Sequence, residues 1–265
     1  CDKTLPAQLM AAASINLPAI SLVVGPMLTG SWRGERLGAC TDCRRQWGRY
    51  RSGEIDEEQI VEAGSELSTT AGTCMVMGTA STMALMTEAL GMMLPGGAAI
   101  PAVHAERLRI AERTGQRAVE MINEHLIPEE IMTPKAFSNA FRVLLAVGGS
   151  TNALIHMTAI AGRRGIKVDL EAFDRMGRET PVLVDLKPSG SNYMEDLYKA
   201  GGLGPILREL QPLLHLDCKT VSGRTLGEEV EQAPLWEQDI VKSIRAPLKS
   251  EGGIAVLKGN LAPET

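Results

Sequence analysis

The spacing of apolar positions predicts a chain made mostly of helices. Thr79 to Leu94 is apolar almost all round, which is typical of a buried helix. His104 to Asn123 is amphipathic, and Thr133-Pro134 offers an N-cap followed by proline at the first helical position of a helix ending at Val147. We expect further helices over Pro6–Asn16, Asp56–Thr69, Ala153–Arg164, Leu170–Met176, Tyr193–Ala200 and from Gly201 to about Leu210.

Two short apolar runs, Ala19–Val24 and Val182–Leu186, predict buried strands between these helices. The first ends sharply at Gly25, as strands do at the carboxyl edge of a parallel sheet, where ligands bind in α/β folds. The pattern therefore predicts an α/β layered domain with a parallel sheet over residues 1–216. Beyond Leu216 short apolar runs lie among turns, so we expect residues 217–265 to form a linker and the beginning of a β-rich domain.

Composition narrows the class of protein. Of 265 residues, 44% are apolar and 22% charged, as in ordinary globular domains. Aromatic residues make up only 3% and the net charge is -5, which argues against a nucleic-acid surface. No apolar run approaches the roughly 20 residues of a membrane span. The chain opens on Cys1 and not on Met, so we expect an internal segment of a longer protein.

The five cysteines are scattered through a long chain, and their number is odd. This pattern does not resemble a secreted disulfide framework, and it predicts free or metal-bound thiols in a reducing, cytoplasmic compartment.

The first three residues combine different kinds of metal ligand. The Cys1 thiolate suits iron or zinc, whereas the Asp2 carboxylate suits magnesium. Burial would favour the neutral amine of Lys3, which can react with carbon dioxide to give a carbamate, an anionic oxygen ligand. The alternative is a solvated Asp2–Lys3 pair at the start of a loop.

The other cysteines allow two interpretations each. Cys74 follows a Gly-Thr pair and precedes the buried helix, whose dipole would favour its thiolate, lower its pKa and make it a ligand or a nucleophile. It can equally be a small buried apolar residue. Cys40 and Cys43 form a C-x-x-C pair that is either a metal or redox site or two unpaired thiols in a turn.

Weaker candidates follow along the chain. Gly148 to Asn152 can cradle an anion or simply cap the following helix with a hydroxyl. His156 is interpreted as a satisfied core histidine. Three polar residues follow the second strand into a loop, where they serve a site or close a turn: Asp185, Lys187 and Ser189.

Seven stretches of the chain, in order, resemble the dihydroxy-acid and sugar-acid dehydratase family. The sugar-acid branch is the more similar one, and within it the pentonate dehydratases of the L-arabinonate type. The stretches are CDKTLPAQLMAA, VVGPMLTG, GTCMVMGTASTMALMTEALGMMLPG, AVGGSTNALIHMTAIA, VLVDLKPSGSNYMEDLYKAGG, TVSGRTLGEEV and GGIAVLKGNLAP.

The resemblance implies two metal centres. Cys1 and Cys74 match ligands of a [2Fe-2S] cluster, Asp2 matches a Mg²⁺ ligand, and Lys3 matches a carbamylated lysine that is catalytic and binds the same metal. The third cluster cysteine, the remaining Mg²⁺ ligands and the serine base would lie outside this segment. The implied fold is an α/β N-terminal domain followed by a β-barrel-like domain.

The implied activity is that of a hydro-lyase. Such an enzyme dehydrates a sugar acid to a 2-keto-3-deoxy acid, with the cluster and Mg²⁺ as Lewis acids. Family members are homo-oligomers, so we expect a dimer or tetramer that binds neither nucleic acid nor membrane.

Two other functions stay open. A branched-chain dihydroxy-acid dehydratase would share the motifs with a smaller, more apolar substrate. A non-catalytic module could instead hold zinc on four cysteines: Cys1, Cys40, Cys43 and Cys74.

Overall fold

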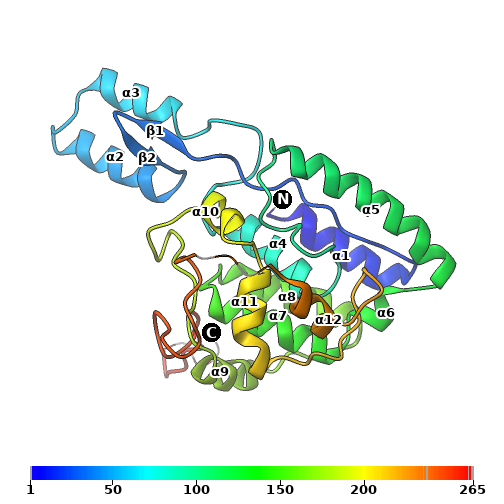
Figure 1. Cartoon of the computed structure of the whole chain (residues 1–265). Coiled ribbons are helices and arrows are strands. Elements are labelled where there is room, and N and C mark those ends of the chain that lie inside the picture. The colour runs from blue at the N-terminus through cyan, green and yellow to red at the C-terminus, as the bar shows by residue number, and fades with distance from the viewer. Residues whose placement is uncertain (1, 235, 237, 262, 264–265) are drawn as a thin grey trace.

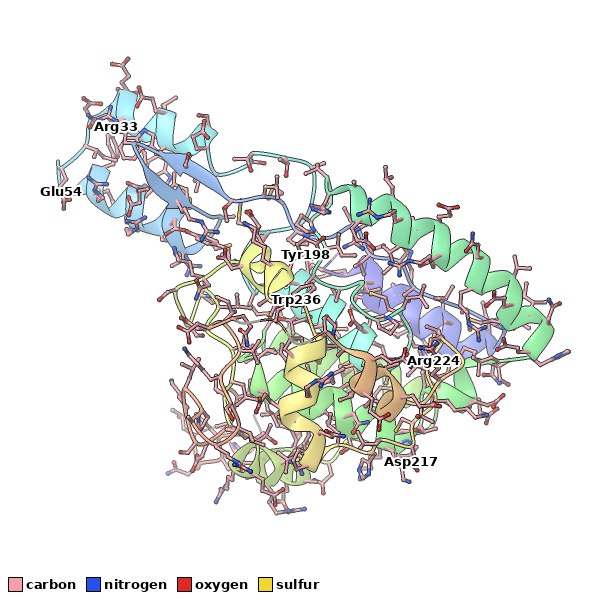
Figure 2. All side chains as sticks on the ribbon, in the orientation of Figure 1. Arg33, Glu54, Tyr198, Asp217, Arg224 and Trp236 are labelled. Carbon is pink, nitrogen blue, oxygen red and sulfur yellow. The ribbon has the colours of Figure 1, made fainter. Side chains whose placement is uncertain are left out.

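A helical body and a narrower arm that projects from it make up the molecule (Figure 1). The computed structural model describes residues 2–234, 236, 238–261 and 263. The arm, residues 28–71, carries Arg33 and Glu54 at the end away from the body (Figure 2). Its elements are β1 (Gly30–Trp32), β2 (Glu35–Leu37), α2 (Thr41–Arg51) and α3 (Glu57–Ser65). The body contains α1 (Thr4–Ile15), α4 (Thr79–Ala89), α5 (Ala105–Glu124), α6 (Pro128–Ile131), α7 (Pro134–Ala146), α8 (Asn152–Arg163), α9 (Leu170–Glu179), α10 (Met194–Lys199), α11 (Gly204–Leu210), a 3₁₀ turn (Gln211–Leu213) and α12 (Leu226–Gln232).

Helix α4 lies at the centre of the body and contacts α1, α7 and α8. Every residue from Ser81 to Ala89 is buried, which confirms the predicted buried helix. The helix is shorter than predicted, because Gly91 adopts φ +85° and turns the chain away. Thr79, the first residue of α4, is partly exposed, and the helix is buried from Ser81 onward. The N-terminus of α4 is therefore both accessible and firmly held, as a site requires.

The predicted helix boundaries hold to within a few residues where a capping residue marks them. Thr133 caps α7 by accepting a hydrogen bond from the Ala136 N–H at 3.3 Å, and Pro134 takes the first helical position. His104 caps α5 in the same way, through the Glu106 N–H at 3.2 Å. These hydrogen bonds are local, so the sequence alone predicts them.

The two predicted strands are wrong as regular strands. Ala19–Val24 forms no ladder, and Val182 and Val184 make only single bridges, to Lys249 and Val241. The one sheet in the described part of the chain is the antiparallel β1–β2 hairpin. A strand needs a continuous neighbour to pair with, and these apolar runs meet theirs at isolated points. The fold is helix-rich and compatible with an α/β class, and its described residues contain no parallel sheet.

The arm has a hydrophobic cluster of its own, separate from the core of the body. An Asp56–Gln59 capping box starts α3, and α3 packs on α2. The cluster residues are Trp32, Leu37, Ile55, Ile60 and Ala63. Neither the hairpin nor α2 was predicted, because α2 is strongly polar and arginine-rich and shows little apolar periodicity.

Residues after Leu216 return to the core of the body. Val221, Leu226 and Val230 belong to the same apolar cluster as α4, and the Val221 N–H donates to the Gly91 carbonyl at 2.8 Å. The predicted domain boundary near this point stays a prediction. In the part of the chain that is described, no helix has the length and apolar character needed to cross a bilayer.

Candidate active site

The N-termini of α1, α4 and α8 meet around Asp2. Asp2 stands directly before α1, and the Thr79 hydroxyl and His156 lie close enough to interact with its carboxyl group. The Thr79 and Ser150 hydroxyls are 2.9 Å apart, and the Asn152 amide donates to Thr79 Oγ1 at 3.1 Å. Because helix N-termini carry partial positive charge, their convergence favours negative charge at this point.

Asp2 keeps one oxygen available for a ligand. Its Oδ2 accepts a hydrogen bond from Lys3 Nζ at 2.8 Å, whereas Oδ1 is buried and makes no hydrogen bond. The Lys3 hydrogen bond and charge lower the pKa of the Asp2 carboxyl, partial burial opposes the shift, and His156 and Thr79 add to it. A carboxylate that stays ionised, with a buried oxygen free, is a good donor for a hard cation.

Lys3 is a surface residue in this chain. Its side chain is 80% exposed and pairs with Asp2, so the structure shows the solvated pair that the sequence left open as the alternative. Among the described residues, none buries the amine in the way that would favour its neutral form. As an ammonium Lys3 would repel a cation, and it fits a metal site only as a carbamate.

His156 is not the satisfied core histidine that its apolar helix suggested. Its Nε2 is buried and has no hydrogen-bond partner. Two unpartnered polar atoms, Asp2 Oδ1 and His156 Nε2, thus lie at the same junction of helices. Buried polar atoms are nearly always hydrogen-bonded, so such a pair marks a place for a ligand.

Cys74 lies where the chain re-enters the body from the arm. The Thr73 N–H donates to the Gly25 carbonyl at 2.9 Å, and the Met27 N–H donates to the Thr73 carbonyl at 2.8 Å. Position 25 requires glycine, because φ is +94° and a Cβ would lie 2.1 Å from the Ile100 carbonyl oxygen. The sharp stop predicted at Gly25 therefore helps to fix Cys74.

Cys74 and Asp2 approach the same helix end. Ser81, in the first turn of α4, donates to the Cys74 carbonyl at 3.4 Å, while Thr79 interacts with Asp2. Two of the predicted site residues are thus brought to the first turn of α4. Cys1, also a predicted site residue, lies outside the described residues.

The predicted lowering of the Cys74 pKa is wrong for this environment. Partial burial raises the pKa of the thiol, and the neighbouring Cys40 side chain adds to the increase. Helix α4 begins only at Thr79, so the helix dipole acts from too far away to outweigh burial.

Asp42 fixes the arm to the body beside Cys74. It is 2% exposed, and its carboxylate accepts hydrogen bonds from Lys187 Nζ at 2.8 and 3.0 Å and from the Tyr193 hydroxyl at 2.8 Å. Burial opposes ionisation of Asp42, yet the Lys187, Tyr193 and Gly38 hydrogen bonds keep its pKa below the ordinary value. No sequence pattern predicts this contact, because Asp42, Lys187 and Tyr193 lie far apart along the chain.

At the end of the apolar run Val182–Leu186 and in the loop that follows it, Asp185 and Lys187 make different kinds of contact. Asp185 closes the turn by accepting from the Ser191 N–H at 2.7 Å and the Asn192 amide at 3.1 Å. Lys187 points instead to Asp42. Asp185 therefore closes the turn, as one alternative held, and Lys187 joins the loop to the arm.

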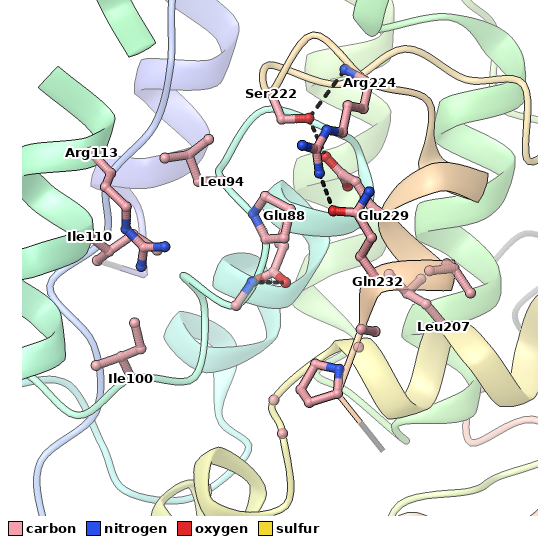
Figure 3. Close-up of a pocket in the computed structure, with 18 of the residues that line it drawn as sticks. Glu88, Leu94, Ile100, Ile110, Arg113, Leu207, Ser222, Arg224, Glu229 and Gln232 are labelled. Carbon is pink, nitrogen blue, oxygen red and sulfur yellow. Dashed lines mark hydrogen bonds between the residues drawn. The ribbon is translucent and has the colours of Figure 1, made fainter. Parts of the chain in front are cut away.

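A cavity of about 720 Å³ lies elsewhere, between α5 and the α11–α12 pair. Figure 3 shows Ile110 on one wall, Leu207 on the other and Glu88 between them. Burial raises the pKa of Glu88 to about 7, although its oxygens accept hydrogen bonds from the Gly96 and Ala98 N–H groups, both at 2.8 Å. None of the predicted site residues lines this cavity.

The donor set fits the implied metals only in part. Cys74 supplies a soft thiol and Asp2 an open hard oxygen. Within the described ranges, no group of three His, Cys, Asp or Glu side chains could hold a metal ion by itself. This finding gives the four-cysteine zinc site no support, though Cys1 lies outside it.

Comparison with known proteins agrees with these motifs. The chain is 49% identical over 266 residues to L-arabinonate dehydratase of Rhizobium leguminosarum bv. trifolii, covering all of this chain and 46% of that protein. It is 44% identical over 264 residues to dihydroxy-acid dehydratase of Thermodesulfovibrio yellowstonii and 41% identical over 266 residues to that of Acetivibrio thermocellus, covering all of this chain and 48% of each. The chain spans about half the length of these relatives.

Residues 1–229 match the family described as dihydroxy-acid/6-phosphogluconate dehydratase N-terminal. This match includes α4, the Asp2 junction and Cys74, which the structure brings together. The chain therefore belongs to the dihydroxy-acid/6-phosphogluconate dehydratase family, through its N-terminal domain.

Proposed function

We propose that the protein containing this chain is a hydro-lyase that removes water from a sugar acid and yields a 2-keto-3-deoxy acid. One observation carries the proposal: Asp2 and Cys74 approach the N-terminus of the same buried helix, α4. Relatives at 41% to 49% identity are named as dehydratases of a sugar acid or of dihydroxy acids, which supports the same reaction type.

Two metal centres are part of this proposal. Cys74, with Cys1, would hold a [2Fe-2S] cluster, and Asp2, with a carbamylated Lys3, would hold Mg²⁺. When bound, such metals supply Lewis acidity that stabilises negative charge developing on the substrate. The open Asp2 Oδ1 and the half-buried Cys74 thiol support these assignments.

The helix ends would orient an anionic substrate. The N-termini of α1, α4 and α8 surround the site, and oriented dipoles favour a carboxylate and the charge that grows on it as the C2 proton leaves. His156 Nε2, unpartnered beside Asp2, is available to hydrogen-bond a substrate hydroxyl. These groups are fixed by the fold, so they need no reorganisation during the reaction.

A pentonate is the preferred substrate and a branched-chain dihydroxy acid the second candidate. The identity to L-arabinonate dehydratase, 49%, exceeds the 44% to a dihydroxy-acid dehydratase, and both relatives cover the whole chain. We also infer the finer features of the fold from the family resemblance: a parallel sheet, a barrel-like C-terminal domain and a cytoplasmic location.

Self-association is a further part of the proposal. On α5, Leu108 (76%), Val119 (61%) and Ile122 (61%) are exposed to solvent. Leu108 and Ile122 stand seven residues on either side of Gly115, where added side-chain atoms would meet no neighbour. Such a face matches itself in antiparallel pairing, which supports a dimer or a tetramer built from dimers.

Metal content and water loss together test the function. We expect the purified protein to contain iron and acid-labile sulfide in equal amounts and to convert L-arabinonate to a keto acid. Cys74→Ser should lose iron and turnover together, while Cys218→Ser, at a buried thiol beside Asn139, should keep both. Stoichiometric zinc in place of iron and sulfide would count against the proposal and favour a zinc-binding module.

A further inference from the structure

Two cysteines from separate segments meet beside the candidate site. Cys40 begins α2 in the arm, and Cys74 lies on the segment that enters the body. The Ala39 N–H donates to Met75 Sδ at 3.0 Å, and a Cβ on Gly38 would lie 3.1 Å from Met75 Cγ. The backbone before Cys40 is thus packed on the side chain of Met75, the residue after Cys74, and both thiols are free.

Hydrogen bonds to Asp42 attach the loop that carries Cys40 to the body. Asp42 accepts a hydrogen bond from the Gly38 N–H at 2.8 Å, and Lys187 and Tyr193 hold its carboxylate from the body. Cys40 itself has φ +67° and ψ -78°, a conformation that is costly for a residue with a side chain and persists only where neighbours impose it. Its thiol makes no capping hydrogen bond to α2, so it is not needed to start that helix.

We propose that Cys40 is a redox partner of Cys74, and that the two thiols form a disulfide when the protein meets a small-molecule disulfide. The resulting Cys40–Cys74 bond would occupy the sulfur that the proposed cluster needs. The pairing itself does not depend on the proposed function, whereas its consequence for metal binding does.

The exposures of the two thiols set the order of events. Cys40 is exposed, so its thiolate attacks the small-molecule disulfide, breaks its S–S bond and releases one thiol. The half-buried Cys74 then loses its proton and attacks the Cys40 sulfur, releasing the second thiol. The protein gives up two electrons and two protons, and the small disulfide is reduced to two thiols.

The other thiols provide controls. Cys43 lies in the first turn of α2, and Cys218 is buried next to Asn139, 3.5 Å from its amide. Cys40 raises the pKa of the Cys74 thiol, and its neighbour Ala39 donates to Met75 Sδ, which places Cys40 next to Cys74. The geometry therefore assigns one pairing among the cysteines whose positions are described.

Disulfide mapping tests the proposal directly. The purified protein would be stripped of metal with a chelator and a thiol, transferred to oxidised glutathione without air, alkylated and digested without reduction. Cys40 and Cys43 share the tryptic peptide Leu37–Arg44, and a glutamate-specific protease places Cys74 in Leu67–Glu88. We expect these two peptides to be linked in the wild type and in Cys43→Ser.

The matched variant separates the pair from its neighbours. In Cys40→Ser the link should vanish, and alkylation of Cys74 should rise by about tenfold over the oxidised wild type. Linkage of Cys74 to Cys1 or Cys43, or glutathione left on Cys40 without a link, would overturn the proposal. Because the readout is a peptide mass, it is independent of whether the protein proves to be a dehydratase.

Discussion

At the scale of single residues, Asp2 and Lys3 are neighbours at the candidate site but carry opposite charges, and only the Asp2 carboxylate can bind a cation as it stands. Asp2 has an open buried oxygen, whereas Lys3 extends into solvent and pairs with the other oxygen of the same carboxylate. A metal ligand role for Lys3 requires its ammonium to become an anion. That requirement gives the first prediction.

Replacing Lys3 distinguishes a carbamate from a simple ion pair. Lys3→Arg keeps the charge and can still pair with Asp2, but a guanidinium does not form a carbamate, so we expect turnover to be lost as fully as in Lys3→Ala. Cluster absorbance should survive in both, and stability should change by no more than about 0.5 kcal/mol, because the side chain is exposed. Steady-state kinetics check this, and near-normal turnover in Lys3→Arg would refute the carbamate role.

Glu88 predicts a pH-dependent stability. Its pKa is raised from 4.5 to about 7 in the folded state, so the fold prefers the protonated form and stability falls as pH rises from about 4.5 to about 7. The loss is about 3 kcal/mol at most. Urea unfolding of Glu88→Gln across this range should show a flatter profile, with part of the slope kept by Glu229, whose pKa burial also raises.

The control for this profile is Glu58→Gln on the exposed side of α3. It should keep the slope of the wild type. A Glu88→Gln profile as steep as the wild type would mean that folding does not raise the pKa of Glu88.

At the scale of elements, helix starts could be predicted from the sequence, whereas the pairing of strands with their neighbours could not. The caps of α5 and α7 depend on residues two or three positions apart, so their starts followed from the sequence. The apolar run Ala19–Val24 also looked like a strand, but a strand exists only with a partner, and no alternation along one segment specifies that partner. Helix α3 of the arm was predicted, whereas the hairpin and α2 were missed, because α2 is polar and the contacts that hold it to the body come from Lys187 and Tyr193, far away in sequence.

The arm predicts a local unfolding event. Lys187→Ala removes one of the two cations that pair with the buried Asp42 carboxylate and leaves Arg45 in place, so we expect a cost of about 2 kcal/mol. Hydrogen exchange should speed up in residues 28–71 before it does in α4, since the arm has its own small core. Lys135→Ala, from an exposed pair with Asp217, is the matched control and should leave exchange unchanged.

At the scale of the whole molecule, the candidate site forms only when segments that are distant in the sequence meet in the folded chain. The sequence identified Asp2, Lys3 and Cys74 through motifs, and the fold added His156 and the meeting of three helix N-termini. No periodicity could predict that junction, because its residues come from the start of the chain, residue 79 and residues 150–156. The chain spans about half the length of its relatives, so the proposed site includes residues from one half of such a protein.

The exposed face of α5 predicts how copies of the protein associate. Val119→Glu places a charge on this face and should shift the protein toward smaller species in analytical ultracentrifugation. Val61→Glu, at a valine of α3 that is 67% exposed, makes the same change in charge on the arm and should have no effect. An unchanged oligomer in Val119→Glu would exclude α5 as the interface.

Dehydration of a sugar acid is the central claim, and keto-acid formation measures it most directly. With its metals in place, the purified protein should convert L-arabinonate to a 2-keto-3-deoxy acid faster than it converts 2,3-dihydroxyisovalerate, and Asp2→Asn should abolish both reactions. Failure to consume either substrate in a preparation rich in iron, sulfide and Mg²⁺ would contradict the account.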